Sequence, residues 1–185
     1  MSGDDDLDFT RTLEPTPPPK PEVVASARKE ATLGTPQLAK SGFYVAMARH
    51  AAGGPVPPRN GAHHSILVIE DDRTLLRLVG EVLAQEGFLT RFARNKAEIS
   101  AEFTKPPLPD LVLLDVSLPD TDGFRILERM RRSSRVAKMP VIMMTGKSEV
   151  ADLTRGLTLG ADGYITKPFK VSGLVSAVNT VLGLG

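Results

Sequence analysis

The sequence predicts an α/β fold in which helices cover both faces of a parallel sheet. From His64 onward, short β-rich apolar runs alternate with amphipathic stretches. Three of the runs, ILVI, LVLLDV and VIMMT, are continuously apolar, which is typical of strands that are buried on both faces. Because strands that alternate with helices are joined by right-handed crossovers, the sheet is expected to be parallel and doubly wound.

Each element can be assigned in chain order. The expected strands are Ile66–Ile69, Phe88–Ala93, Leu111–Val116, Val141–Thr145 and Gly163–Thr166, and the expected helices are Thr74–Gln85, Lys96–Phe103, Gly123–Arg131, Glu149–Leu159 and Val171–Leu182. A (βα)5 chain of this kind gives the flavodoxin-like strand order 2-1-3-4-5. The second strand alternates more than the others and carries Arg91, so we expect it at an edge of the sheet.

Residues 1–62 differ in composition from the rest of the chain. They hold most of the 15 prolines and few large aliphatic side chains, so they bury too little apolar surface to offset the entropy of ordering. We expect residues 1–62 to form a Pro-rich, mostly disordered extension, and residues 63–185 to form the folded domain. Residues 37–52 have helical spacing, which predicts a transient helix or a helix formed against a partner. A translation start at Met47 is a further alternative.

The overall composition excludes several kinds of chemistry. The 185 residues include no cysteine, which removes disulfides, thiolate metal sites and cysteine nucleophiles. Lys and Arg number 23 and Asp and Glu number 22, for a formal net charge of +1, so no global charge favours nucleic acid or a membrane. The acidic start MSGDDD is unlike a secretory signal. We therefore expect a cytoplasmic protein without membrane contact.

One local cluster of basic residues needs a separate explanation. It lies at the end of the third predicted helix and just beyond it, and contains Arg129, Arg131, Arg132, Arg135 and Lys138. Cations are favoured at a helix C-terminus, and aromatic residues that could stack on bases are not interleaved with them. We interpret the cluster as a solvated face and expect no nucleic-acid partner.

Charged and polar residues stand at the ends of four predicted strands. Glu70 and Asp71 follow the first, Asp115 lies near the end of the third, Thr145 closes the fourth and Lys167 follows the fifth. The fold brings these strand ends to one edge of the sheet, where ligands bind. Converging carboxylates repel one another unless a cation holds them, and all-oxygen ligands suit Mg²⁺. The sequence thus predicts a magnesium site that handles phosphate.

The same residues can take part in phosphoryl transfer. A carboxylate such as Asp115 can act as the nucleophile, while Lys167 and the hydroxyl of Thr145 stabilise charge on the transferring oxygens. Taken singly, each residue has an ordinary structural explanation as a helix cap, a solvated lysine or a β-branched strand residue. Their convergence at one sheet edge favours the functional interpretation.

These motifs resemble those of response-regulator receiver domains, the phosphoacceptor modules of two-component signalling. The resemblance covers residues 64–183 and is carried by ILVIEDD, LVLLDVSLPDTDGF, VIMMTG and GADGYITKPF. It implies that Asp115 accepts a phosphoryl group from a histidine kinase or a His-phosphotransfer protein. It also implies that Glu70, Asp71, Asp115 and the backbone carbonyl of Ser117 hold Mg²⁺.

The resemblance further implies a conformational switch. Thr145 and Lys167 would contact the phosphoryl group, and Tyr164 would move inward together with Thr145 on activation. The Lys167–Pro168 bond is expected to be cis. The surface that responds would be the 149–182 face, and we expect that face to contact an unknown downstream protein or a second copy of the chain.

The chain ends directly after the last predicted helix, which predicts output through protein contact without a DNA-binding domain. Expected activity is limited to Mg-dependent self-phosphorylation from a donor and autodephosphorylation, so the protein is not an enzyme in the usual sense. A receiver-like scaffold that acts without phosphorylation is the alternative. A phosphatase with an aspartate nucleophile would need an acid/base Asp where Ser117 stands. A dinucleotide site would need glycines where Glu70 and Asp71 stand.

Overall fold

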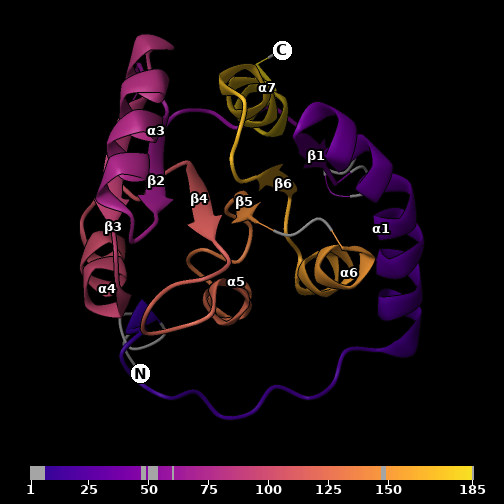
Figure 1. Ribbon diagram of the computed structural model, residues 1–185. Coiled ribbons are helices and arrows are strands. Elements are labelled where there is room, and N and C mark those ends of the chain that lie inside the picture. Colours follow the sequence, from indigo (N-terminus) through magenta and orange to yellow (C-terminus); the bar gives the residue numbers. More distant parts are fainter. Residues whose placement is uncertain (1–6, 47–48, 50–53, 60, 147–148, 185) are drawn as a thin grey trace.

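The structure is a computed structural model, and the residues it describes are 7–46, 49, 54–59, 61–146 and 149–184. One sheet has the strand order β1-β6-β5-β4-β2-β3, with helices packed on both of its faces (Figure 1). The strands are β1 (Phe43–Val45), β2 (Ser65–Ile69), β3 (Leu89–Ala93), β4 (Leu111–Asp115), β5 (Val141–Thr145) and β6 (Gly163–Thr166). The helices are α1 (Pro21–Ser41), α3 (Arg73–Gln85), α4 (Lys96–Thr104), α5 (Gly123–Arg132), α6 (Val150–Leu159) and α7 (Val171–Leu182).

The predicted doubly wound topology is confirmed. The segment β3-β2-β4-β5-β6 is the expected order 2-1-3-4-5, and its strand pairs are parallel. Strand β3 lies at the edge, as its alternating pattern predicted, and it exposes Leu89 and Phe92. Strand β1 is an addition to the prediction, because it pairs antiparallel with β6 at the opposite edge.

The central strands are apolar throughout because their alternate side chains enter two different cores. Leu67 and Ile69 of β2 belong to the core formed with α4, α5 and α6. Ile66 and Val68 of the same strand belong to the core formed with α3 and α7. Strands β2, β4 and β5 are buried along their whole length, so they hold their carboxyl ends in fixed positions.

Polar side chains set the start of three of the surrounding helices. Asp72 accepts hydrogen bonds from the amides of Thr74 and Leu75 at the start of α3. Asn95 and Asp122 act in the same way at the starts of α4 and α5. Side-chain oxygens at this position satisfy amides that have no partner within the helix. Asp72 is therefore a helix cap, although it adjoins the acidic pair Glu70 and Asp71.

The expected disorder of residues 1–62 is wrong for a large part of that segment. Residues 21–41 form helix α1, which lies against α6, and residues 43–45 form β1 (Figure 1). The buried side of α1 is a stripe of Ala27, Ala31, Gly34 and Leu38. Composition pointed to disorder because small residues bury little area, but at helical spacing they allow close packing against another helix. The helix expected over residues 37–52 is wrong for residues 43–45, which form β1, while residues 37–41 are the last turn of α1. Met47 lies outside the described residues.

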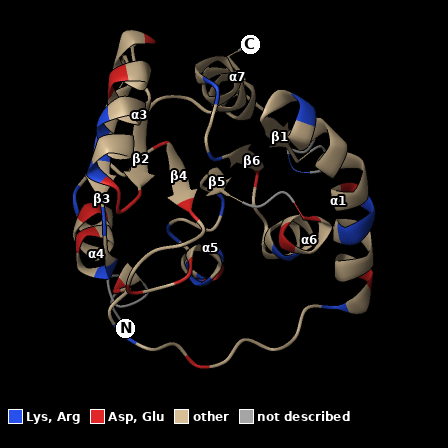
Figure 2. Ribbon diagram, viewed as in Figure 1, with Lys and Arg blue, Asp and Glu red and all other residues tan. Residues whose placement is uncertain are grey.

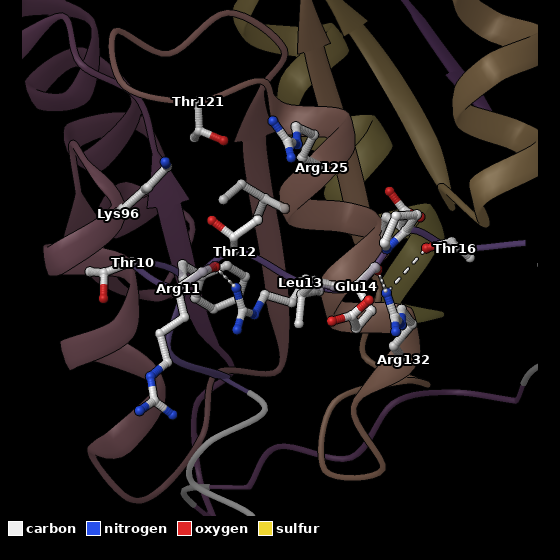
Figure 3. A pocket seen from close by; sticks show the side chains of 15 residues that line it. Thr10, Arg11, Thr12, Leu13, Glu14, Thr16, Lys96, Thr121, Arg125 and Arg132 are labelled. Carbon is white, nitrogen blue, oxygen red and sulfur yellow. Dashed lines mark hydrogen bonds between the residues drawn. The ribbon is translucent and has the colours of Figure 1, made fainter.

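Residues 7–16, which we call the strap, also pack on the domain. Leu7 and Phe9 are buried, and the ring centroids of Phe9 and Phe103 are 5.6 Å apart. The strap crosses α5 beside a cavity of about 180 Å³ (Figure 3). From residue 7 onward, the extension therefore lies beside α4 and α5, runs past α5 and enters α1 next to α6 (Figure 1).

The basic cluster on α5 is only partly the solvated face that we expected. Arg129 is buried, and it donates to the carbonyl of Arg11 at 2.6 Å. Arg132 donates to the carbonyl of Glu14 at 2.9 Å (Figure 3). Arg131 donates to the carboxylate of Asp162 at 2.8 Å, and burial lowers its pKa to about 10. The correction arises because the strap and the α6–β6 loop supply acceptors that the local sequence does not reveal.

Candidate functional site

The candidate site lies where β2, β4, β5 and β6 end. Acidic residues gather at the carboxyl ends of β2 and β4 (Figure 2). The strand register places Asp115 beside Met144 and Thr145 beside Thr166, so residues distant in the sequence come to the same edge of the sheet. This is the edge at which ligands bind in doubly wound folds.

Three carboxylates form a compact group at this edge. Glu70, Asp71 and Asp115 each offer an oxygen atom, and these atoms all lie within 4.8 Å of one another. Glu70 and Asp115 are each 2 % exposed, whereas Asp71 is exposed to solvent. The group combines all-oxygen donors with an open side, and this donor set fits a hard divalent ion such as Mg²⁺ that keeps some of its waters.

Lys167 is the cation that balances this group. Its Nζ lies 2.9 Å from Oε2 of Glu70 and 3.0 Å from Oδ1 of Asp115. Its backbone amide donates to the carbonyl of Thr145 at 2.7 Å, and the Lys167–Pro168 bond is cis, as expected. The lysine therefore connects three of the strand ends that the sequence prediction brought together.

Burial and charge perturb the pKa values of both partners. Desolvation raises the pKa of Glu70, and the negative charge of Asp115 raises it further, against the opposing effect of Lys167. For Lys167, desolvation acts to lower the pKa, but hydrogen bonds to Glu70 and Asp115 outweigh it, so the pKa is raised. Perturbed acids and bases that converge in this way are typical of functional sites.

The surroundings of Asp115 fix the position of its carboxylate. The amide of Ser117 donates to Oδ1 of Asp115 at 3.1 Å, and the amide of Gly123 donates to the carbonyl of Val116 at 2.8 Å. A Cβ atom on Gly123 would lie 2.2 Å from the carbonyl oxygen of Asp115. Only glycine allows α5 to begin this close to β4. No local sequence pattern distinguishes this role of Gly123, although the run DTDGF contains it.

The two predicted switch residues are both buried on neighbouring strands. Thr145 is buried at the end of β5, and Tyr164 is fully buried on β6. The hydroxyl of Tyr164 lies 3.4 Å from the carbonyl of Asp152, and a Cβ on Gly156 would be 1.5 Å from that hydroxyl. Burial raises the pKa of Tyr164 far above its ordinary value. Gly156 thus makes the space beneath α6 that the tyrosine occupies, a role that the local sequence around Gly156 does not reveal.

The 149–182 face, predicted to bind a partner, is not open in this structure. Helix α1 lies along α6, and β1 lies along β6 and contacts α7. The part of the chain that the structure describes contains no helix long and apolar enough to cross a bilayer.

Comparisons with known proteins agree with this geometry. The family model described as the response regulator receiver domain matches residues 66–179. The chain is 38% identical over 117 residues to the phosphate regulon transcriptional regulatory protein PhoB of Escherichia coli, covering 63% of this chain and 51% of the relative. It is 37% identical over 137 residues to the transcriptional regulatory protein TrcR of Mycobacterium tuberculosis, covering 72% and 52%. The chain thus spans about half the length of these curated relatives.

Solved structures give the same result. A putative response regulator from Chloroflexus aurantiacus superposes with a TM-score of 0.62 at 30% identity, covering 65% of this chain and 98% of that one. The chemotaxis protein CheY4 of Vibrio cholerae superposes with a TM-score of 0.62 at 26% identity, covering 65% and 100%. The matched part is the (βα)5 domain with its acidic pocket, and the chain belongs to the response-regulator receiver family.

Proposed function

We propose that this protein accepts a phosphoryl group on Asp115 from a histidine kinase or a His-phosphotransfer protein and signals by protein contact. The observation that carries the proposal is a buried carboxylate at the end of a central strand, with Lys167 Nζ 3.0 Å away and the carboxylates of Glu70 and Asp71 beside it. The pocket combines an acceptor, a cation and a metal-type donor set.

The transfer forms one bond and breaks another. An oxygen of Asp115 attacks the phosphorus atom of the donor, the bond from phosphorus to the donor's histidine nitrogen breaks, and that nitrogen takes up a proton. Glu70, Asp71, Asp115 and the carbonyl of Ser117 would hold Mg²⁺, which supplies positive charge against the phosphoryl oxygens. Lys167 moves from Asp115 to the new oxygens, and the hydroxyl of Thr145 donates to one of them. Water later hydrolyses the acyl phosphate.

The test is phosphorylation by a small donor. With Mg²⁺ and acetyl phosphate, intact-mass measurement should show one added phosphoryl group, and Asp115→Asn should not be labelled. Asp72→Asn is the matched control, because Asp72 is a neighbouring carboxylate that caps α3 and should not affect labelling. An unlabelled parent protein would favour the alternative, a receiver-like scaffold that acts without phosphorylation. Equal labelling of Asp115→Asn would show that the acceptor is a different residue.

A further inference from the structure

Residues 21–45, which we call the cover, occupy the α6–β6–α7 face of the domain. Strand β1 extends the sheet, with Phe43 opposite Ile165 and Tyr44 opposite Tyr164. The carbonyl of Gly42 accepts hydrogen bonds from the amide of Thr166 at 3.0 Å and from its hydroxyl at 3.3 Å. Helix α1 packs against α6 (Figure 1). A protein could bind this face only after the cover had left it.

The two parts of the cover are joined to each other. The hydroxyl of Tyr44 donates to Oε1 of Glu30 at 2.9 Å, across from β1 to α1. A Cβ on Gly34 would lie 2.9 Å from the ring of Tyr44, so the ring packs directly on the helix backbone. Residues 21–45 should therefore attach and detach as one unit.

The contact between helix α1 of the cover and the domain rests mainly on small side chains, together with Leu38. The buried stripe of α1 consists of Ala27, Ala31, Gly34 and Leu38. Because the hydrophobic contribution scales with the apolar area removed from water, such a stripe holds a helix less tightly than one of large aliphatic residues. The strap is anchored separately, by Phe9 on Phe103 and by Arg129 on the carbonyl of Arg11. It would keep a detached cover close to its binding face.

The cover is connected to the phosphate pocket through Thr166, the last residue of β6, and Lys167, which follows the strand. Thr166 bonds to Gly42 of the cover, and the next residue, Lys167, bonds to Glu70 and Asp115. Tyr164, two residues before Thr166, lies in one core cluster with Ala31 and Tyr44. A displacement of Lys167 or Tyr164 therefore acts on the strand and the core that hold the cover.

We propose that the cover is a releasable intramolecular occupant of the partner surface, and that phosphorylation of Asp115 loosens it. This inference rests on the proposed function. A phosphoryl group adds about −1.5 to −2 charges and draws Lys167 away from its present partners. The end of β6 follows Lys167, and the bonds from Thr166 to Gly42 weaken. Release then exposes the α6–β6–α7 face to a protein partner.

Amide exchange on the full chain tests this coupling, with beryllofluoride and Mg²⁺ as the phosphoryl probe. Fluorine NMR reports whether the pocket has bound the probe, and exchange reports on residues 21–45. We expect the bound form to exchange roughly tenfold faster in residues 21–45, a typical size for coupling between two sites. If beryllofluoride binds but amide exchange in residues 21–45 is unchanged or slower, the cover proposal is wrong and the proposed function still stands. If neither beryllofluoride binds nor acetyl phosphate labels Asp115, the proposed function and the cover proposal both fail.

Linkage supplies a reciprocal test. If the probe loosens the cover, a variant that loosens the cover must bind the probe more tightly, by at most the same factor. Gly34→Val forces a side chain against Tyr44, and we expect tighter binding of beryllofluoride, by up to about tenfold. Gly54→Val is the matched control, since no atom lies within 4 Å of a Cβ at Gly54. Tyr44→Phe, which removes the hydroxyl that donates to Glu30, gives the same test with a milder change. Unaltered binding in both cover variants rejects the coupling.

Discussion

The ammonium of Lys167 lies 3.0 Å from Oδ1 of Asp115, and this contact closes a charge cluster that spans two strand ends. The same ammonium lies 2.9 Å from Glu70, which is almost fully buried. Buried carboxylates without such a partner would be costly. Lys167 therefore does two things in the unphosphorylated form: it neutralises the acceptor, and it competes with any cation that binds the same oxygens.

Removing this competitor should tighten metal binding. Lys167→Met leaves the carboxylates without their internal cation, so we expect Mg²⁺ affinity to rise roughly tenfold, equivalent to about 1.4 kcal/mol. Calorimetric titration measures it. Lys170→Met, at an exposed lysine just before α7, is the control and should bind Mg²⁺ like the parent. Weaker binding in Lys167→Met would mean that the lysine positions the ligands more than it competes for them.

The carboxylates of the pocket and the neighbouring Asp72 should differ in role. Asp71→Ala and Asp115→Ala should each cause a large loss of Mg²⁺ affinity, and Glu70→Gln a smaller one. Asp72→Ala should retain the affinity but lower the free energy of unfolding by about 1 kcal/mol, because it removes a helix cap. Asp72→Asn keeps a capping oxygen and should restore that stability. Titration and denaturant unfolding separate the two effects, and comparable metal loss in Asp72→Ala and Asp71→Ala would contradict the assignment.

The raised pKa of Glu70 should be visible in the pH dependence of stability. Because the folded state holds this proton more tightly than the unfolded state, the associated stability is full below the ordinary glutamate pKa of about 4.3 and is lost as pH rises through the raised value. Without Mg²⁺, Glu70→Gln should therefore unfold at a higher temperature than the parent near neutral pH. The difference should vanish at acidic pH. A variant less stable than the parent at neutral pH would show that the bond to Lys167 outweighs desolvation.

Detachment of the strap should not unfold the rest of the protein. Phe9→Ala removes the contacts with Phe103 and Arg129, so we expect faster tryptic cleavage at Arg11 and little change in the global melting temperature. Thr12→Ala, at an exposed position of the strap, should be cleaved like the parent. If Phe9→Ala is not cleaved faster, other contacts hold the strap.

Much of the (βα)5 domain and its pocket could be predicted from the sequence, for a local physical reason. Continuous apolar runs specify strands buried on both faces, and alternation with helices specifies a parallel sheet whose carboxyl ends meet at one edge. That is sufficient to bring Glu70, Asp71, Asp115, Thr145 and Lys167 together without any knowledge of distances. It also places the cap at Asp72, since capping depends only on neighbouring amides.

The structure of α1 and β1 in the extension was determined only by tertiary contacts. Ala27, Ala31 and Gly34 carry little hydrophobic signal, and they form a packing surface only because α6 offers a close-fitting partner. Strand β1 exists because β6 presents an unpaired edge, which no local pattern in residues 43–45 reveals. The position of Tyr164 likewise depends on the space left by Gly156 on another element. Sequence patterns report what a segment can bury by itself, whereas these contacts depend on surfaces that exist only after the domain has folded.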